Sequence, residues 1–313
     1  MAHTMKPGAG RHWASINEVS FVAGMRLLFW ICRVFGRWPF RLVLYPVLLW
    51  YVATKPAARR ASNEFLARAG APSGLAGVLR HFASFAENIL DKMLLWGGLF
   101  DTSKVSCHGD APLLRMIAEG RGALLMCSHL GNLDLCRVLS QQTPGLKLTV
   151  LVHTRHARAF NDMLAQLDPR SQLNLLQVTE VTPATAMMLS ERVARGEFVV
   201  IAGDRIPVAP NPRVVAASFL GHAAAFPVGP YVMASVLDCP LYMLFSTGRE
   251  LHFELLRESV RLPRKARDAA LSALAADYAA RLEYHTMRAP LEWFNFYDFW
   301  HLPTGAEAGS TYA

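Results

Sequence analysis

The stretch GALLMCSHLGNLD, residues 122–134, decides the fold. Its first half, Gly122–Cys127, is a short apolar run without charge, which predicts a strand buried on both faces. Its second half contains a glycine and several polar residues, and it predicts a turn followed by a helix over Leu133–Leu139. A buried strand that passes through a polar turn into a helix is the repeating unit of α/β proteins.

The same alternation continues toward the C-terminus. Strands are predicted over Leu148–Val152, Phe198–Ala202 and Leu241–Thr247. The predicted helices cover Leu75–Trp96, Ala157–Leu167, Pro183–Arg195, Pro230–Leu237 and the amphipathic stretch from Arg264 to Met287. We therefore expect one α/β domain over residues 69–302, with a central mixed β-sheet flanked by helices and a flexible tail over 303–313.

Composition excludes several classes of protein. The chain has 313 residues, of which 52% are hydrophobic and 18% charged, so it can bury a large core and is not a disordered chain. Its five cysteines are scattered and never form a C-x-x-C pair, which favours reduced thiols over a disulfide framework or zinc knuckle.

The N-terminal segment, residues 1–68, carries the whole net charge of +8, with ten Lys or Arg against two Glu. Its cations alternate with aromatic residues, and a helix is predicted over Val19–Tyr51, which is typical of a segment lying on a membrane surface. The longest charge-free run, Leu42–Thr54, contains Pro46 and is shorter than a membrane span. Packing against the rest of the protein is the alternative, whereas no nucleic-acid-binding motif accompanies the charge, so no nucleic-acid partner is expected.

His129 and Asp134 form the strongest candidate for chemistry. Gly131 allows a sharp turn that places His129 before the helix and Asp134 in its first turn. A carboxylate that accepts from one imidazole nitrogen leaves the other nitrogen free to act as a general base. The alternative is ordinary helix capping, with Asn132 or Ser128 as the cap and Asp134 favoured by the helix dipole.

Two further segments predict ligand binding. Gly203, Asp204 and Arg205 follow the strand Phe198–Ala202, where α/β sheets bind ligands, and the guanidinium suits a phosphate or carboxylate. An ion pair between Arg205 and Asp204 is the structural alternative. The uncharged stretch 214–237 contains Gly and Pro residues that would break a membrane helix, so we interpret it as a strand or loop, a turn and a helix that line an apolar cavity. Its residues Phe226, Pro227 and Gly229 would hold an alkyl chain, although core packing explains the segment equally well.

Two other residue sets offer side chains of reactive types. His153 and His156 offer only two imidazoles without a third ligand, so no metal site is predicted. Cys127 is a poor candidate nucleophile because it lies in the predicted buried strand.

Taken together, these segments resemble the bacterial late lipid A acyltransferases, within the wider group of glycerolipid and lysophospholipid acyltransferases. The resemblance rests on the H-x4-D box at His129 and Asp134, where the family usually has Glu as the acid, and on three further segments. These are GDRIP (Gly203–Pro207), FLG with AAFPVGP (Phe219–Pro230) and WFNFYDFW (Trp293–Trp300). The last segment and AGDR are more similar to the branch found beside aryl polyene or other bacterial lipid pathways.

The resemblance implies acyl transfer from a thioester to a hydroxyl of a membrane lipid or glycolipid at the cytoplasmic face of the bacterial inner membrane. Acyl carrier protein is the expected donor, acyl-CoA the alternative, and no cofactor is needed. His129 would be the base, Asp134 would orient it, and backbone N–H groups near Asn132 would stabilise the oxyanion. A non-catalytic membrane-peripheral scaffold is the rival from another class, and a glycosyltransferase is disfavoured because no D-x-D motif occurs.

Overall fold

The computed structural model describes residues 30–136, 143, 145–152, 173–177, 182–206 and 212–302. The parts outside the described residues include residues 1–29 of the basic N-terminal segment, the predicted helix Ala157–Leu167, His153, His156, Pro207 and the tail 303–313.

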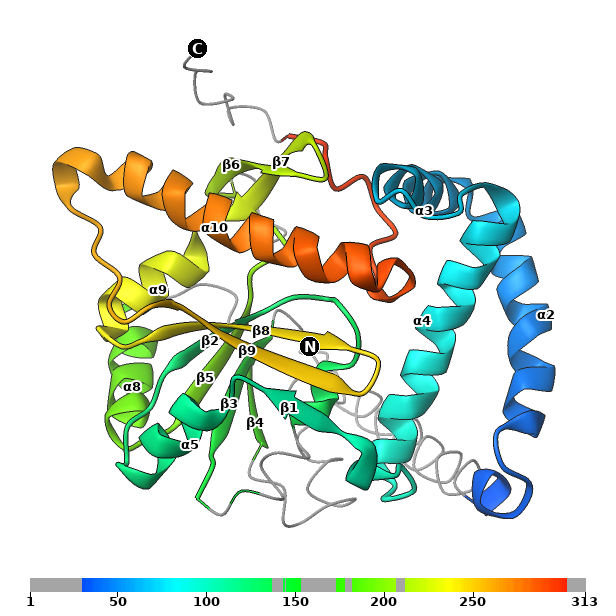
Figure 1. Ribbon diagram of the computed structural model, residues 1–313, viewed down its shortest axis with the longest axis horizontal. Helices are drawn as coiled ribbons and strands as arrows, with labels where there is room; N and C mark the ends of the chain where they lie inside the picture. The colour runs from blue at the N-terminus through cyan, green and yellow to red at the C-terminus, as the bar shows by residue number, and fades with distance from the viewer. Residues whose placement is uncertain are drawn as a thin grey trace, which may run out of the picture.

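A seven-stranded mixed sheet forms the centre of the protein (Figure 1). Its strand order is β1-β9-β8-β2-β5-β3-β4, and all neighbours run parallel except β8 and β9. The strands are β1 Ser106–His108, β2 Leu124–Cys127, β3 Leu148–Val152, β4 Leu173–Gln177, β5 Phe198–Ala202, β8 Leu241–Thr247 and β9 Glu250–Arg257. A separate antiparallel pair consists of β6 Val214–Phe219 and β7 His222–Pro227. The expected mixed sheet is confirmed.

Helices lie around this sheet, with α10 crossing it in Figure 1. The α-helices are α2 Trp38–Thr54, α3 Pro56–Arg68, α4 Gly74–Trp96, α5 Ala111–Ala118, α8 Pro183–Ala194, α9 Gly229–Leu237 and α10 Arg267–Arg288. Short 3-10 turns are η1 Thr102–Lys104, η2 Leu133–Leu135, η3 Arg264–Ala266 and η4 Pro290–Glu292.

The two faces of β2 lie in two different hydrophobic clusters because alternate side chains of a strand point to opposite faces. Leu124 and Met126 pack in a cluster with residues of α8, α9 and α10. Leu125 and Cys127 pack in a second cluster with residues of α4 and α5. The strand is therefore buried on both sides, as its uninterrupted apolar sequence predicted.

The predicted helix over Val19–Tyr51 is interrupted where it is described. Residues 30–35 are helical, Gly36 takes a φ of +69°, and α2 then begins at Trp38. Beyond α2, residues 59–68 belong to the helix α3. None of the helices in the described part of the chain combines the length and apolar character that a membrane crossing requires.

Two arginines at the start of α2, Arg41 within the helix and Arg37 just before it, reach toward acids of α4. Arg41 pairs with Glu87 at 2.6 Å, and Arg37 pairs with Asp91. These two cations of the basic N-terminal segment are therefore paired within the protein at partly exposed positions. The outward surface of α2 is left apolar, with Trp38, Leu42, Val43, Val47, Leu49 and Trp50 all exposed.

Candidate active site

The loop after β2 makes a close approach to the end of β8. Gly131 adopts a φ of +63°, and a Cβ atom added there would lie 2.3 Å from the carbonyl oxygen of Ser246. Only glycine satisfies both the left-handed backbone and this contact. The Ser246 hydroxyl also accepts from the Asn132 N–H and donates to the Asn132 carbonyl, at 3.2 Å each. The loop that carries His129 is therefore held firmly against β8.

His129 forms its hydrogen bonds with Asp204, which follows the neighbouring strand β5. The His129 Nδ1 lies 2.8 Å from Asp204 Oδ1, and the His129 backbone N–H donates to Oδ2 at 2.7 Å. Because β2 and β5 run parallel with Cys127 opposite Ala202, the residues after each strand emerge side by side. Strand register thus brings together two residues that are 75 positions apart in the chain.

Gly203 makes this approach possible. Its N–H donates to the Cys127 carbonyl at 2.8 Å, which extends the β2–β5 pairing. A Cβ atom at this position would lie 2.6 Å from Met126 Cγ and 2.8 Å from Tyr278 Cζ. Gly203 was predicted to bind substrate, whereas the structure places it in the packed interior, where it positions Asp204.

Asp204 is a buried carboxylate with a full set of donors. Its side chain is 1% exposed, and Oδ2 accepts a further hydrogen bond from the indole Nε1 of Trp293 at 3.1 Å. Burial alone would raise the pKa of Asp204, but His129 and Arg205 outweigh it and hold that pKa below its usual value. An ionised Asp204 can only accept, so His129 Nδ1 carries the proton and Nε2 has the free lone pair. The His129 side chain is 37% exposed, which leaves Nε2 available as a general base.

Asp134 does not make the predicted contact. Among the described residues, His129 and Asp134 share neither a hydrogen bond nor an ion pair, and Asp134 lies 3.4 Å from Lys92 Nζ on α4. The expectation that Asp134 orients the imidazole is thus corrected, because Nδ1 is already engaged by the residue that strand pairing places beside it. Whether Asp134 takes part in catalysis in another way stays a prediction.

Asn132 caps the short turn η2. Its Oδ1 accepts from the Asp134 N–H at 3.1 Å, as the capping interpretation predicted. Its Nδ2 is buried and has no hydrogen-bond partner among the residues that the structure describes. The backbone N–H groups of Gly131, Asn132 and Asp134 are all engaged, with Glu292, Ser246 and Asn132 as acceptors. These three are therefore not the free oxyanion donors that we expected near Asn132.

Arg205 is exposed beside this pair. It donates to the Phe294 carbonyl at 2.9 Å, and its guanidinium lies 5.6 Å from the centre of the Tyr297 ring. It forms no ion pair with Asp204, so that structural alternative does not apply between these two described residues. The exposed guanidinium remains free to meet an anionic group.

The predicted apolar wall belongs largely to the core. Phe226 is fully buried and packs edge to face against Phe219 and Tyr278. Pro227 is also buried, whereas Gly229 is exposed at the start of α9. Core packing, the alternative kept open above, accounts for Phe226, and the described residues give it no surface on which an alkyl chain could rest.

A segment near the C-terminus, residues 292–294, covers the His129 loop, and the sequence had not indicated this. Leu130 and Trp293 form an antiparallel bridge, flanked by hydrogen bonds from Phe294 N–H to the His129 carbonyl at 3.0 Å and from Gly131 N–H to the Glu292 carbonyl at 2.8 Å. The available signal was the density of aromatic residues over Trp293–Trp300, which resembles the family pattern but does not by itself reveal what it contacts.

Cys127 is unsuited to nucleophilic chemistry. It is buried at the end of β2, and burial raises the pKa of its thiol far above the usual value, with the Asp204 charge acting in the same direction. The thiolate that a nucleophile requires is therefore strongly disfavoured.

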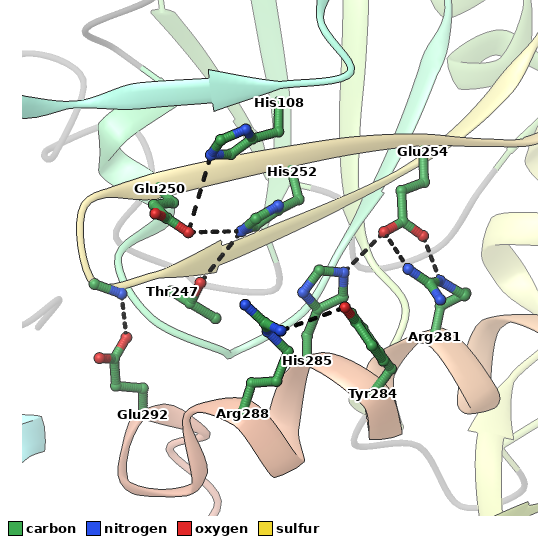
Figure 2. A network of polar contacts seen from close by, with 11 residues as sticks. His108, Thr247, Glu250, His252, Glu254, Arg281, Tyr284, His285, Arg288 and Glu292 are labelled. Atoms are coloured by element: carbon green, nitrogen blue, oxygen red, sulfur yellow. Dashed lines mark hydrogen bonds and ion pairs between the residues drawn. The ribbon is translucent and has the colours of Figure 1, made fainter.

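A second histidine–carboxylate pair lies between β9 and α10 (Figure 2). His285 Nε2 is 2.8 Å from Glu254 Oε1, and Arg281 binds both oxygens of the same carboxylate at 2.6 and 2.7 Å. Burial would raise the pKa of Glu254, but the hydrogen bonds from His285 and Arg281 outweigh it and lower that pKa to about 2. His285 is stacked on Phe245 and only 3% of its side chain is exposed, so this imidazole is closed to a substrate.

Comparison with known proteins identifies the family. Curated protein sequences gave no match. A sequence profile of the family described as bacterial lipid A biosynthesis acyltransferase matches residues 102–301, well over half of the chain. The matched region contains His129, Asp134, Asp204 and the covering segment with Trp293. The chain therefore belongs to the bacterial lipid A biosynthesis acyltransferase family and is an acyltransferase.

Proposed function

We propose that the protein transfers a fatty acyl group from acyl carrier protein to a hydroxyl of a membrane lipid or glycolipid, with His129 as general base. The observation that carries this proposal is the imidazole itself. Its Nδ1 is held by a buried, ionised Asp204, and its Nε2, on a partly exposed side chain, has no partner in the described part of the chain. That arrangement suits removal of a proton from an acceptor hydroxyl.

In the proposed reaction, Nε2 takes the hydroxyl proton as the oxygen attacks the thioester carbonyl. The tetrahedral intermediate then expels the thiolate, which receives that proton from the imidazolium. Asp204 stays ionised throughout and stabilises the imidazolium through Nδ1. General-base assistance of this kind accelerates a reaction by about 10²–10⁴-fold.

Asn132 is our candidate donor to the oxyanion. Its amide orientation is set by the hydrogen bond from the Asp134 N–H to Oδ1, so Nδ2 faces away from that contact. Nδ2 has no acceptor among the described residues, so an oxygen atom that reached it when the substrate binds would gain a hydrogen bond that the free protein lacks.

Three charged side chains would complete the site. Asp134 lies on the same loop as His129, and its negative charge would favour the imidazolium that forms during the reaction. Lys92, paired with Asp134, and the exposed Arg205 offer positive charge for a phosphate or carboxylate on donor or acceptor.

The outward face of α2 would rest in the membrane at its cytoplasmic side. Trp38 and Trp50 are 70% and 64% exposed, which is unfavourable in water and typical of side chains at a lipid interface. Arg37 and Arg41 are neutralised by acids of α4, so apolar contact would supply most of the binding. The exposed cations Lys55 and Arg60, just beyond this face, would meet anionic headgroups.

The test is acyl transfer from labelled acyl carrier protein, and separately from labelled acyl-CoA, into a total bacterial lipid extract. Membranes containing wild type, His129→Ala, Asp134→Ala or His222→Ala would be compared at equal protein level. His222 is the matched control because it is an exposed histidine on β7, far in sequence from the loop.

We expect wild type and His222→Ala to form the same labelled lipid from acyl carrier protein, and His129→Ala to form at least a hundredfold less. If wild type uses acyl-CoA in preference to acyl carrier protein, the proposed donor is wrong, but the proposed acyl transfer stands. No transfer by wild type from either donor, or equal transfer by His129→Ala, would contradict the proposal and favour a non-catalytic role at the membrane.

A further inference from the structure

Trp293 contacts the catalytic pair from a distant part of the chain. Its indole Nε1 donates to Asp204 Oδ2 at 3.1 Å, and Trp293 itself is 1% exposed. The carboxylate accepts three hydrogen bonds in the described structure, of which two come from His129. Trp293 thus supplies the one donor that does not move together with His129.

We infer that Trp293 is a positioning residue for the His129–Asp204 pair, an inference that rests on the proposed function. Without the indole, both remaining bonds to Asp204 come from the residue that the carboxylate is meant to orient. The His129 backbone N–H and Trp293 Nε1 share Oδ2, which directs Oδ1 toward Nδ1. The indole therefore fixes the rotation of the carboxylate independently of His129.

The position of the indole is itself well defined. Its ring lies against Phe65, Phe219 and Phe299, with centroid distances of 4.8, 5.1 and 4.8 Å. Its backbone bridges Leu130, and the next residue donates to the His129 carbonyl. One short segment therefore holds both members of the pair, His129 through its backbone and Asp204 through its side chain.

His81 on α4 supports Trp293 from behind. Its Nε2 lies 3.0 Å from the Trp293 carbonyl, which can only accept, so Nε2 carries the proton and Nδ1 accepts from the Ser62 hydroxyl at 2.8 Å. A chain of contacts thereby leads from α3 through α4 and Trp293 to Asp204. The backbone of Trp293 is fixed by a neutral, fully buried histidine.

Satisfying the indole N–H does not explain this contact. Trp300 lies in the same aromatic group, and its Nε1 donates to an ordinary backbone carbonyl, that of Phe219, at 3.1 Å. A backbone carbonyl is therefore a sufficient acceptor for the indole N–H of a tryptophan whose role is core packing. Placing a buried carboxylate opposite Trp293 is far more costly, which is consistent with a role for the charge.

The test removes the N–H and keeps the ring. Trp293 would be replaced by 3-benzothienylalanine, in which sulfur stands where the indole has N–H, and the same replacement at Trp300 is the matched control. Both variants lose one indole hydrogen bond of equal length, but only the first touches Asp204. Acyl transfer would be measured as kcat and KM across pH, and the His129 imidazole would be titrated by nitrogen-15 NMR.

At Trp293 we expect kcat to fall about tenfold or more with KM for the acyl donor little changed, since a charge-assisted hydrogen bond is lost. The nitrogen-15 signals of the His129 imidazole should differ from wild type across the pH series, because the carboxylate that faces Nδ1 is no longer held by the indole. The Trp300 replacement should leave both quantities near wild type. Trp293→Phe, a natural residue, would also remove the N–H, but together with part of the packed ring.

An unchanged kcat and an unchanged His129 titration in the Trp293 replacement would overturn the inference while leaving the proposed function intact. If wild type transfers no acyl group, the proposed function fails, and the NMR titration still decides whether Trp293 acts on the pair.

Discussion

Two histidine–carboxylate pairs of equal length lie in different parts of this protein. His129 meets Asp204 at the carboxyl ends of β2 and β5, and His285 meets Glu254 between α10 and β9 (Figure 2), both at 2.8 Å. They differ in what surrounds them. Arg281 binds both oxygens of Glu254 and His285 is closed off, whereas neutral N–H donors complete the shell of Asp204 and His129 is partly exposed.

The difference shows that hydrogen-bond length alone does not decide which pair could serve as the proposed catalytic dyad. An arginine already neutralises Glu254, so little of its charge is left to stabilise a proton on His285, and substrate cannot reach that ring. Asp204 keeps its charge for His129, whose second nitrogen is unengaged. Two features distinguish the pairs: the exposure of the imidazole, and the lack of an arginine hydrogen-bonded to Asp204 among the described residues.

The largest expected effect comes from Asp204→Asn. The amide oxygen would face the two N–H donors that now bind Oδ2, so its NH2 group would face His129 Nδ1 and force the proton onto Nε2. The general base would then be lost, and we expect kcat to fall by about 10²–10⁴-fold. Steady-state acyl transfer with a circular dichroism check of folding measures this. A loss no greater than that of Glu254→Gln would erase the distinction between the two pairs.

His81, the histidine behind Trp293, should give a smaller effect that appears in stability. Burial lowers its pKa from 6.5 to about 4, so the unfolded chain binds more protons than the folded one between these values. The free energy of unfolding should therefore decrease as pH falls through this window, by about 3 kcal/mol in total. Urea unfolding at several pH values, with wild type compared with His81→Gln, measures this contribution. If the free energy of unfolding depends on pH in the same way for wild type and His81→Gln, the pKa of His81 is not lowered by folding.

Glu254→Gln should change stability least and leave activity alone. Losing the charge weakens the bonds from Arg281 and His285, which we expect to lower the free energy of unfolding by about 2 kcal/mol. The pKa of Glu254 is lowered to about 2, so its stabilisation is complete above about pH 4.5 and lost as pH falls toward 2. Acyl transfer below the melting temperature should stay within twofold of wild type. A large loss of kcat with an intact fold would place this second pair in the reaction.

Much of the sheet could be predicted because its central strands are locally distinctive. The predicted bounds of β3, β5 and β8 are those of the structure, since each is an apolar run ended by a change in composition. The strand β9 was not predicted, because its pattern of buried and exposed residues mixes charged and apolar side chains over Glu250–Arg257. The three-residue strand β1 is too short to give a pattern.

The sequence by itself determined the type of fold, the importance of the loop at His129 and the family resemblance that the profile match confirms. Each of these depends on residues that are adjacent in the chain. Only the tertiary structure decided which acid meets His129, because that choice depends on β2 pairing with β5 and on Gly203 leaving room for the approach. It also brought Trp293 onto Asp204, a contact across 89 positions that no local spacing encodes. The spacing of the motif predicted Asp134 as the partner of His129. In the structure the partner is Asp204, because strand register, which is set by packing of the whole sheet, places it beside His129.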